Sequence, residues 1–161
     1  MTVLCWGILE YWDIYVGLNL IRDAVNIIKW GSDWLLKASP KELVLYGQVG
    51  DAKKDHGSWE RPESIKGRRK TWKITKEKPG TDLAAAAAAA LAASALVFER
   101  TVSNPDITKP REEAKDTKAM SNKYITRLVK KAEQLYELAK VRVSFKQNCD
   151  FTCHLYLCFV V

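Results

Sequence analysis

Hydrophobic residues recur every three or four positions in several stretches of the chain, which is the period of one face of an α-helix. Residues 2–38 predict two helices that are separated near Gly17. Thr2–Val16 is apolar nearly all round, so we expect it to be buried between other helices. In the second helix Asn19 is the expected N-cap, and Ser39-Pro40 ends the apolar stripe. That stripe consists of Ile21, Ala24, Val25, Ile28, Gly31, Trp34, Leu35 and Ala38.

Two further helices are predicted in the second half of the chain. Leu83–Phe98 contains seven consecutive alanines, Ala84–Ala90, and alanine is the strongest helix former. Thr81 or Asp82 is the expected N-cap, because a short oxygen-bearing side chain can accept the first free amide hydrogens. Ile125–Val143 returns to the helical period. Its stripe consists of Leu128, Ala132, Leu135, Tyr136, Leu138 and Ala139.

A membrane-spanning helix is the alternative for Leu83–Phe98. Sixteen residues at 1.5 Å each extend over roughly 24 Å, which falls short of the ~30 Å hydrocarbon core of a bilayer. Alanine is also only weakly apolar. We therefore predict a buried helix whose small side chains let neighbours approach closely, and we expect no membrane partner.

Glycine and proline interrupt residues 40–80 so often that no long helix can form there. These breakers are Gly47, Gly50, Gly57, Pro62, Gly67, Pro79 and Gly80. Leu43–Tyr46 is a candidate for a short extended segment. The rest predicts an ordered loop region of the kind that carries function. By contrast, residues 103–123 are polar and charged, and 107–123 is expected to be a disordered insertion.

The net charge of +7 and the pI near 9.2 permit an anionic partner. Lys66–Lys70 followed by Trp72 is the candidate nucleic-acid patch. One short basic loop is more often a solvated surface, so we expect no nucleic-acid partner. Zinc is the other alternative, with Cys149, Cys153, His154 and Cys158 as ligands. Their spacing fits no common zinc site, and we expect neither a metal nor a cofactor.

Four side chains of the glycine-rich region suggest a sugar site: Tyr46, His56, Trp59 and Arg61. A tryptophan face can stack on a pyranose ring, while histidine and arginine donate hydrogen bonds to its hydroxyls. The alternative is a purely structural loop, packed by Trp59 and held by an ion pair between Arg61 and Glu63. These residues alone leave both interpretations open.

The same region resembles the signature of family 9 glycoside hydrolases, the endo-β-1,4-glucanases of plants and bacteria. In that family an "LY-x-QVGD" strand leads to "DH-x-x-WERPE", as Leu45–Asp51 leads here to Asp55–Glu63. Lys29–Ala38 is similar to the family's "KWGTDYLLKA", and Pro79–Phe98 to its alanine-rich helix. Ala132–Ala139 is similar to "AKQLF-x-FA". The similar segments occur in the family's order.

The resemblance implies an all-α fold, an incomplete (α/α)6 barrel of helical hairpins with a long ordered loop region at 40–80. It assigns residues 1–145 to part of the catalytic domain and leaves 146–161 as a divergent tail. It also implies endo-hydrolysis of β-1,4-glucan with inversion, and a secreted protein of the cell wall. Met1–Leu9 shows no signal-peptide pattern, because it lacks a basic start.

By the family pattern, His56 and Trp59 match cleft residues that hold glucosyl units, and Tyr46 and Arg61 belong to the same motif. Inverting hydrolysis needs a base and an acid carboxylate about 6.5–9.5 Å apart. The family's "DAGD" base motif and its C-terminal glutamate are absent from this sequence, and Glu60 and Glu63 match other positions. We therefore expect no catalytic residue here, and an inactive isolated chain. The alternatives are a non-catalytic carbohydrate-binding remnant and a basic nucleic-acid-associated protein.

Overall fold

A computed structural model describes residues 1–57, 59–64, 67–104 and 122–141. In chain order the elements are α1 (Thr2–Glu10), α2 (Trp12–Gly17), α3 (Ile21–Ala38), β1 (Leu45–Val49), α4 (Ala52–Gly57), the 3-10 turn η1 (Pro62–Ser64), β2 (Thr71–Ile74), α5 (Thr81–Val102) and α6 (Asn122–Lys140). The predicted insertion at 107–123 falls largely outside the described residues. The tail at 146–161, with its three cysteines and His154, lies entirely outside them.

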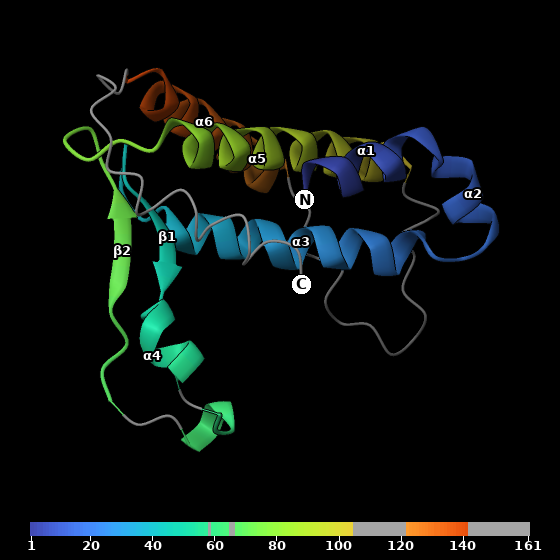
Figure 1. Ribbon diagram of the computed structural model, residues 1–161. Coiled ribbons are helices and arrows are strands. Elements are labelled where there is room, and N and C mark those ends of the chain that lie inside the picture. The colour runs from blue at the N-terminus through green and yellow to red at the C-terminus, as the bar shows by residue number, and fades with distance from the viewer. Residues whose placement is uncertain (58, 65–66, 105–121, 142–161) are drawn as a thin grey trace.

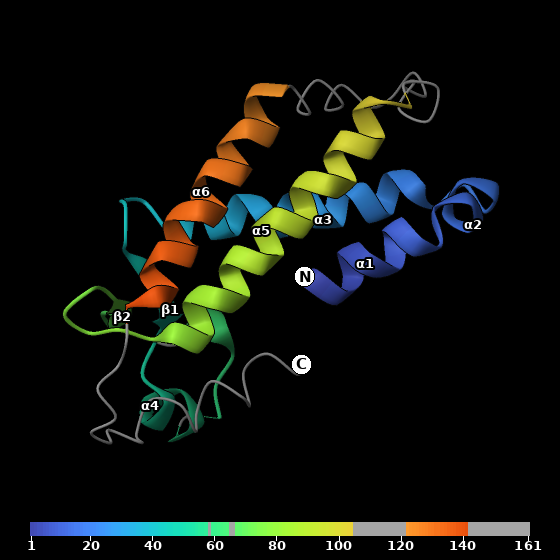
Figure 2. The ribbon, with the colours of Figure 1, turned by 90° about the horizontal axis from the view of Figure 1, so that it is seen from above.

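The long helices form two layers, which we call the body. In the upper layer of Figure 1, α5 lies between α6 and α1, and α3 forms the lower layer. Figure 2 shows α5 and α6 side by side and antiparallel, with α3 crossing beneath them. The predicted all-α architecture is therefore confirmed as a mostly helical fold that is consistent with an incomplete barrel.

The core lies between α5 and its neighbours, and small side chains let these helices approach closely. Phe98 and Leu91 on α5 are fully buried, as are Leu128 and Leu135 on α6. The predicted stripe of α6 is confirmed except at Tyr136, which is 57% exposed. The aromatic ring points to solvent because the helix turns its aliphatic positions toward α5.

Helix α5 begins earlier and ends later than its alanine run predicts. Its N-cap is Gly80, while Thr81 and Asp82 are its first two helical residues, so the predicted side-chain cap is wrong. Close packing explains the glycine, because a Cβ at Gly80 would come within 2.8 Å of the Ile74 side chain. Of the described helices, α5 alone is long and apolar enough to cross a membrane, but 56% of its apolar window is buried inside the body.

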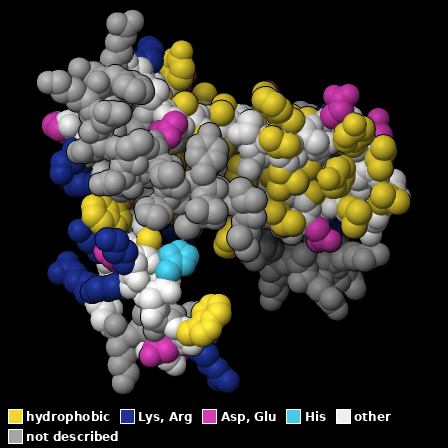
Figure 3. All heavy atoms as spheres, viewed as in Figure 1, with side chains coloured by type: hydrophobic (Ala, Val, Ile, Leu, Met, Phe, Trp, Pro, Cys, Tyr) yellow, Lys and Arg dark blue, Asp and Glu magenta, His cyan; other side chains and the backbone are white. Residues whose placement is uncertain are grey.

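The first helical segment differs from its prediction in two ways. It breaks at Tyr11 into α1 and α2, and only Cys5, Ile8 and Trp12 in these two helices are buried. Val3 is 77% exposed, so the expectation that this segment is buried on all sides is wrong for this chain. α1 contacts α5, α3 and α2, and hydrophobic side chains gather on the surface over α1 and α2 in Figure 3.

Helix α3 ends at Ala38 before Ser39-Pro40, as predicted, but its start and its buried face differ from the prediction. Leu20 is the N-cap, and Asn19 adopts a left-handed conformation (φ 58°) in the preceding turn. Ser32 and Leu36 join the buried face, whereas Trp34 is 46% exposed. Ser32 can be buried because its hydroxyl donates to the Ile28 carbonyl oxygen, 2.8 Å away.

Helices α3 and α6 are joined by a small polar cluster. The Tyr124 hydroxyl donates to Asp33 Oδ1 (2.8 Å), and Lys29 Nζ contacts Asp33 Oδ2 (2.6 Å). Partial burial opposes ionisation of Asp33, but the hydrogen bonds from Lys29 and Tyr124 outweigh it and hold the pKa of that carboxyl below its ordinary value. Burial, followed by the bond to Asp33, raises the pKa of Tyr124. The tyrosine therefore stays protonated and donating.

Candidate functional site

Strands β1 and β2 form an antiparallel pair that carries the glycine-rich region away from the body; we call residues 45–74 the arm (Figure 1). Leu45 pairs with Ile74 at the body end, and both side chains are buried. Val49 pairs with Thr71 at the far end, after a register shift between Tyr46 and Gln48. The extended segment predicted at Leu43–Tyr46 is therefore only half right: the strand begins at Leu45 and continues to Val49, while Leu43 lies in a turn with a positive φ of 53°.

The loop beyond the strands opens with a short helix. Asp51 Oδ1 accepts hydrogen bonds from the backbone amides of Lys53 (3.1 Å) and Lys54 (3.3 Å). Asp51 therefore acts as the N-cap of α4. No residue of α4 is buried. Local hydrogen bonds therefore stabilise this helix, and no buried side chain packs it against the rest of the protein.

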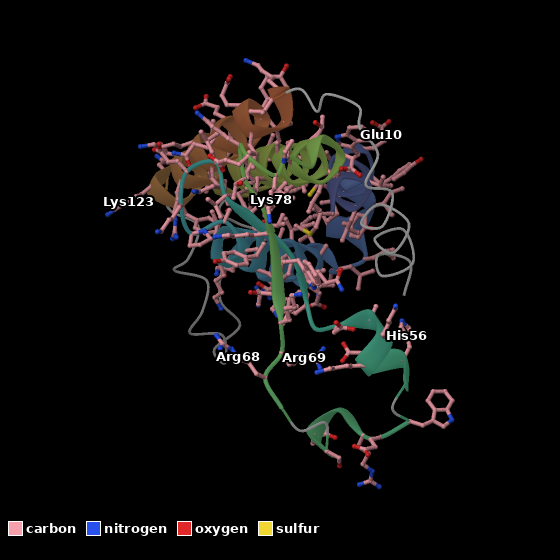
Figure 4. The ribbon with its side chains drawn as sticks, turned by 60° about the vertical axis from the view of Figure 1, so that its left-hand side comes forward. Glu10, His56, Arg68, Arg69, Lys78 and Lys123 are labelled. Atoms are coloured by element: carbon pink, nitrogen blue, oxygen red, sulfur yellow. The ribbon has the colours of Figure 1, made fainter. Side chains whose placement is uncertain are left out.

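The four predicted site residues occupy two parts of the arm. Tyr46 is half-buried on β1, near the body. His56 is exposed on α4, and Figure 4 shows that it lies on the outer part of the arm. Trp59 and Arg61 follow in the loop. Trp59 is fully exposed, at 106% of the accessible area of a reference tryptophan. Within the described part of the chain, no hydrogen bond or ring contact joins any two of these four side chains.

The structural-loop interpretation does not agree with this arrangement. A fully exposed Trp59 packs nothing, and among the described residues no ion pair joins Arg61 to Glu63. The exposed Trp59 ring presents a large apolar face that a ligand can reach. Exposed aromatic and donor groups on one loop are suited to an amphipathic ligand such as a sugar.

The arm encloses an open hollow of about 1190 Å³ between α4 and the segment that returns to β2. Its lining carries six basic side chains, Lys53, Lys54, Arg61, Arg68, Arg69 and Lys70, and four acidic ones, Asp51, Asp55, Glu60 and Glu63. Lys and Arg side chains also gather on this part of the surface in Figure 3. The lining offers both hydrogen-bond donors and acceptors, but Tyr46, His56 and Trp59 are not part of it.

Two members of the candidate basic patch at Lys66–Lys70 make contacts within the arm. Arg69 Nη2 donates to Asp55 Oδ2 (2.6 Å), and Lys70 Nζ lies 3.9 Å from the centre of the Trp72 ring. In the described ranges no group of three or more His, Cys, Asp or Glu side chains could hold a metal ion. The proposed zinc ligands of the tail lie outside those ranges.

The sequence did not indicate the contact between Asp55 and Arg69. They are fourteen positions apart in the sequence, and the pairing of β1 with β2 brings them together. The glycine of the "QVGD" motif was the available signal. Gly50 has a positive φ of 104°, a backbone conformation that residues with a side chain rarely adopt. The ion pair between Asp55 and Arg69 lies beside this glycine.

Three comparisons with known proteins agree with this fold. The sequence model of glycosyl hydrolase family 9 matches residues 1–156. Endoglucanase 19 of Arabidopsis thaliana is 38% identical over 139 residues, 86% of this chain and 19% of that protein. The chain therefore spans about a fifth of that relative's length.

Solved structures give the same result. The endoglucanase of the termite Nasutitermes takasagoensis superposes with a TM-score of 0.72 at 29% identity, over 99% of this chain and 32% of that one. The cellulase Cel9M of C. cellulolyticum in complex with cellobiose superposes at 0.68 and 24% identity, over 91% and 31% of the two chains, and supports the fold. The family match does not itself test the boundary at 145/146, which stays a prediction. The chain belongs to glycosyl hydrolase family 9.

Proposed function

We propose that this chain supplies part of the glucan-binding surface of an endo-β-1,4-glucanase. The single observation that carries the proposal is the full exposure of Trp59 on a polar loop that also presents His56. A ring that packs against no protein group is available to stack on a glucosyl unit. The cellobiose bound to a structural relative supports an oligosaccharide as the ligand.

The roles of the four side chains follow from their chemistry and positions. Trp59 stacks on the apolar face of a pyranose ring, and His56 and Arg61 hydrogen-bond to hydroxyls of the same or the next unit. Tyr46, nearer the body, contacts a unit farther along the chain of sugars. A linear glucan lying along the arm would meet them in succession.

Hydrolysis is the reaction of the family's endoglucanases, and we propose it for the complete protein that uses this surface. The family's base and acid motifs do not occur in this sequence, so the 161-residue chain should bind glucan without cleaving it. A glucan ligand also places the protein outside the cell, in the wall.

Binding is tested by titrating the chain with cellohexaose and following tryptophan fluorescence or heat. We expect Trp59→Ala to weaken binding on the order of tenfold, since loss of one stacking platform removes about 1 kcal/mol or more. Trp30→Ala is the matched control, because Trp30 is also exposed (76%) but lies on α3. Equal losses in the two variants would overturn the site.

Hydrolysis is tested separately with carboxymethylcellulose. We expect no release of reducing ends by the isolated chain above a buffer blank. Release that Glu63→Gln abolishes would show that a carboxylate of the arm acts in catalysis, and would refute the proposal of a binding surface without turnover.

A further inference from the structure

The loop between β1 and β2 is closed by two contacts at one point. The Gly50 amide donates to the Lys70 carbonyl oxygen (2.7 Å), and Arg69 Nη2 donates to Asp55 Oδ2 (2.6 Å). The first contact continues the backbone pairing of the strands by one step. The second connects α4 to the segment that returns to β2, so both sides of the loop are held where the strands end.

The ion pair lies directly on the backbone of Gly50. A Cβ added at Gly50 would lie 2.5 Å from Asp55 Oδ2 and closer still to Arg69 Nη2. Gly50 is buried and has a φ of 104°, so a side chain there would be strained as well as crowded. Glycine thus makes room for the two charged groups to meet over the chain.

This ion pair joins α4 to the β2 side of the arm. Helix α4 buries no side chain, and among the described residues the bond from Arg69 is the side-chain hydrogen bond that we find between α4 and the β2 side. Asp55 directly precedes His56 in α4, and Trp59 follows the end of that helix. Figure 4 shows Arg69 on the side of its segment that faces α4, and Arg68 on the opposite side.

We propose that Asp55 and Arg69 form a clasp, seated on Gly50, that positions His56 and Trp59 for a glucan chain. The proposal rests on the glucan-binding function proposed above and adds two positioning residues to it. Neither Asp55 nor Arg69 need touch the sugar. Without the clasp, α4 is free to swing, and the bound arrangement is reached only part of the time.

The test is the affinity for cellohexaose of paired variants. Exposed ion pairs contribute up to about a factor of five, and the two partners are 33% and 45% exposed. We therefore expect Arg69→Gln and Asp55→Asn each to weaken binding by roughly three- to fivefold. The double variant should be no weaker than either single one, because each substitution already breaks the same contact.

Arg68→Gln is the matched control, since it removes the same charge from the neighbouring residue. It should change affinity by less than about twofold. Arg69→Lys should recover part of the loss by restoring a cation opposite Asp55. Gly50→Ala should have the largest effect, on the order of tenfold, because it displaces the ion pair and strains the backbone together.

Three outcomes would overturn the clasp, and they are distinguishable. If the unaltered chain does not bind cellohexaose, the glucan-binding function fails and the clasp fails with it. If that chain binds but Arg69→Gln behaves like Arg68→Gln, the clasp alone fails. The clasp would also be refuted if Arg69→Gln or Asp55→Asn lowered the urea unfolding midpoint enough to explain its loss of affinity. The ion pair would then stabilise the whole fold and not the loop.

Discussion

The body and the arm of this molecule keep their shape by different means. The body buries large side chains between helices, and Phe98, Leu91, Leu128 and Leu135 are wholly excluded from water. Among its described residues, the arm buries side chains only at its root, at Leu45 and Ile74, and hydrogen bonds and one ion pair hold its outer loop. Burial gives the body its stability, whereas the arm buries little surface, is less stable, and leaves its polar and aromatic groups exposed to a ligand.

The largest effect should come from emptying the body's core. Leu135 of α6 is fully buried, so Leu135→Ala should lower the free energy of unfolding by about 2–5 kcal/mol. The adjacent Tyr136 is 57% exposed, and Tyr136→Ala should cost less than about 0.5 kcal/mol. Urea denaturation followed by far-UV circular dichroism measures both. Similar losses at the two positions would mean that α6 does not pack on α5 as described.

Overfilling the same core should cost less than emptying it. Ala88 of α5 is 5% exposed, and Ala88→Leu should destabilise the fold by about 1–3 kcal/mol, because the close-packed neighbours must move apart. Ala89→Leu adds the same atoms at the next position, which is exposed, and should be nearly neutral. A stabilising Ala88→Leu substitution, seen in the same urea titration, would reveal an unfilled space beside α5.

The contrast between body and arm also explains what the sequence could predict. The long helices were predicted because alanine content and a 3.6-residue period are local signals; their boundaries moved, and the first predicted helix broke at Tyr11 into α1 and α2. The predicted N-caps were wrong at Asn19 and at Thr81 or Asp82. Gly80 is selected by close packing against Ile74, which is a tertiary effect, and Asn19 adopts the left-handed turn conformation that asparagine tolerates. The exposure of α1 was not predicted, because a helix that is apolar all round is expected to be buried, and its sequence does not show how many other helices pack against it.

For the arm, the sequence indicated which residue types could bind a ligand but not how they are arranged in space. Tyr46, His56, Trp59 and Arg61 were selected for their chemistry, and their role stays a prediction. The pairing of Asp55 with Arg69 depends on strand register and on a positive φ at Gly50. Neither is visible in a local pattern, which is why no sequence argument brought these two residues together.

A smaller effect is expected where α3 meets α6. Tyr124→Phe removes the hydroxyl that donates to Asp33 Oδ1 but keeps the ring that packs edge-on against Phe98. The loss should be about 1 kcal/mol, below the ~1.5–3 kcal/mol of a hydrogen bond to a charged group, because Asp33 is partly exposed to water. Tyr136→Phe is the control on the same helix and should be neutral. Equal unfolding midpoints for both variants would show that the Asp33 bond does not stabilise the body.

The same cluster predicts a pH dependence with a definite sign. The pKa of Asp33 is lowered in the folded state, mainly through hydrogen bonds that overcome partial burial. Its contribution to stability is therefore present above the ordinary pKa of 3.8 and is lost as pH falls through the lower, folded value. The side chain is 37% exposed, so the loss should be only a few tenths of a kcal/mol. Asp33→Asn should remove that part of the pH dependence between about pH 5 and 2.

The smallest effect on stability should come from the arm, and it tests the comparison most directly. Trp59 is 106% exposed, so Trp59→Ala removes no buried surface and should change the free energy of unfolding by less than about 0.5 kcal/mol. If the arm is a binding surface carried by an independent core, the same substitution must weaken cellohexaose binding while the urea midpoint stays fixed. A lowered midpoint would instead mean that the ring packs on the protein in solution, and the arm would then have to be regarded as part of the core.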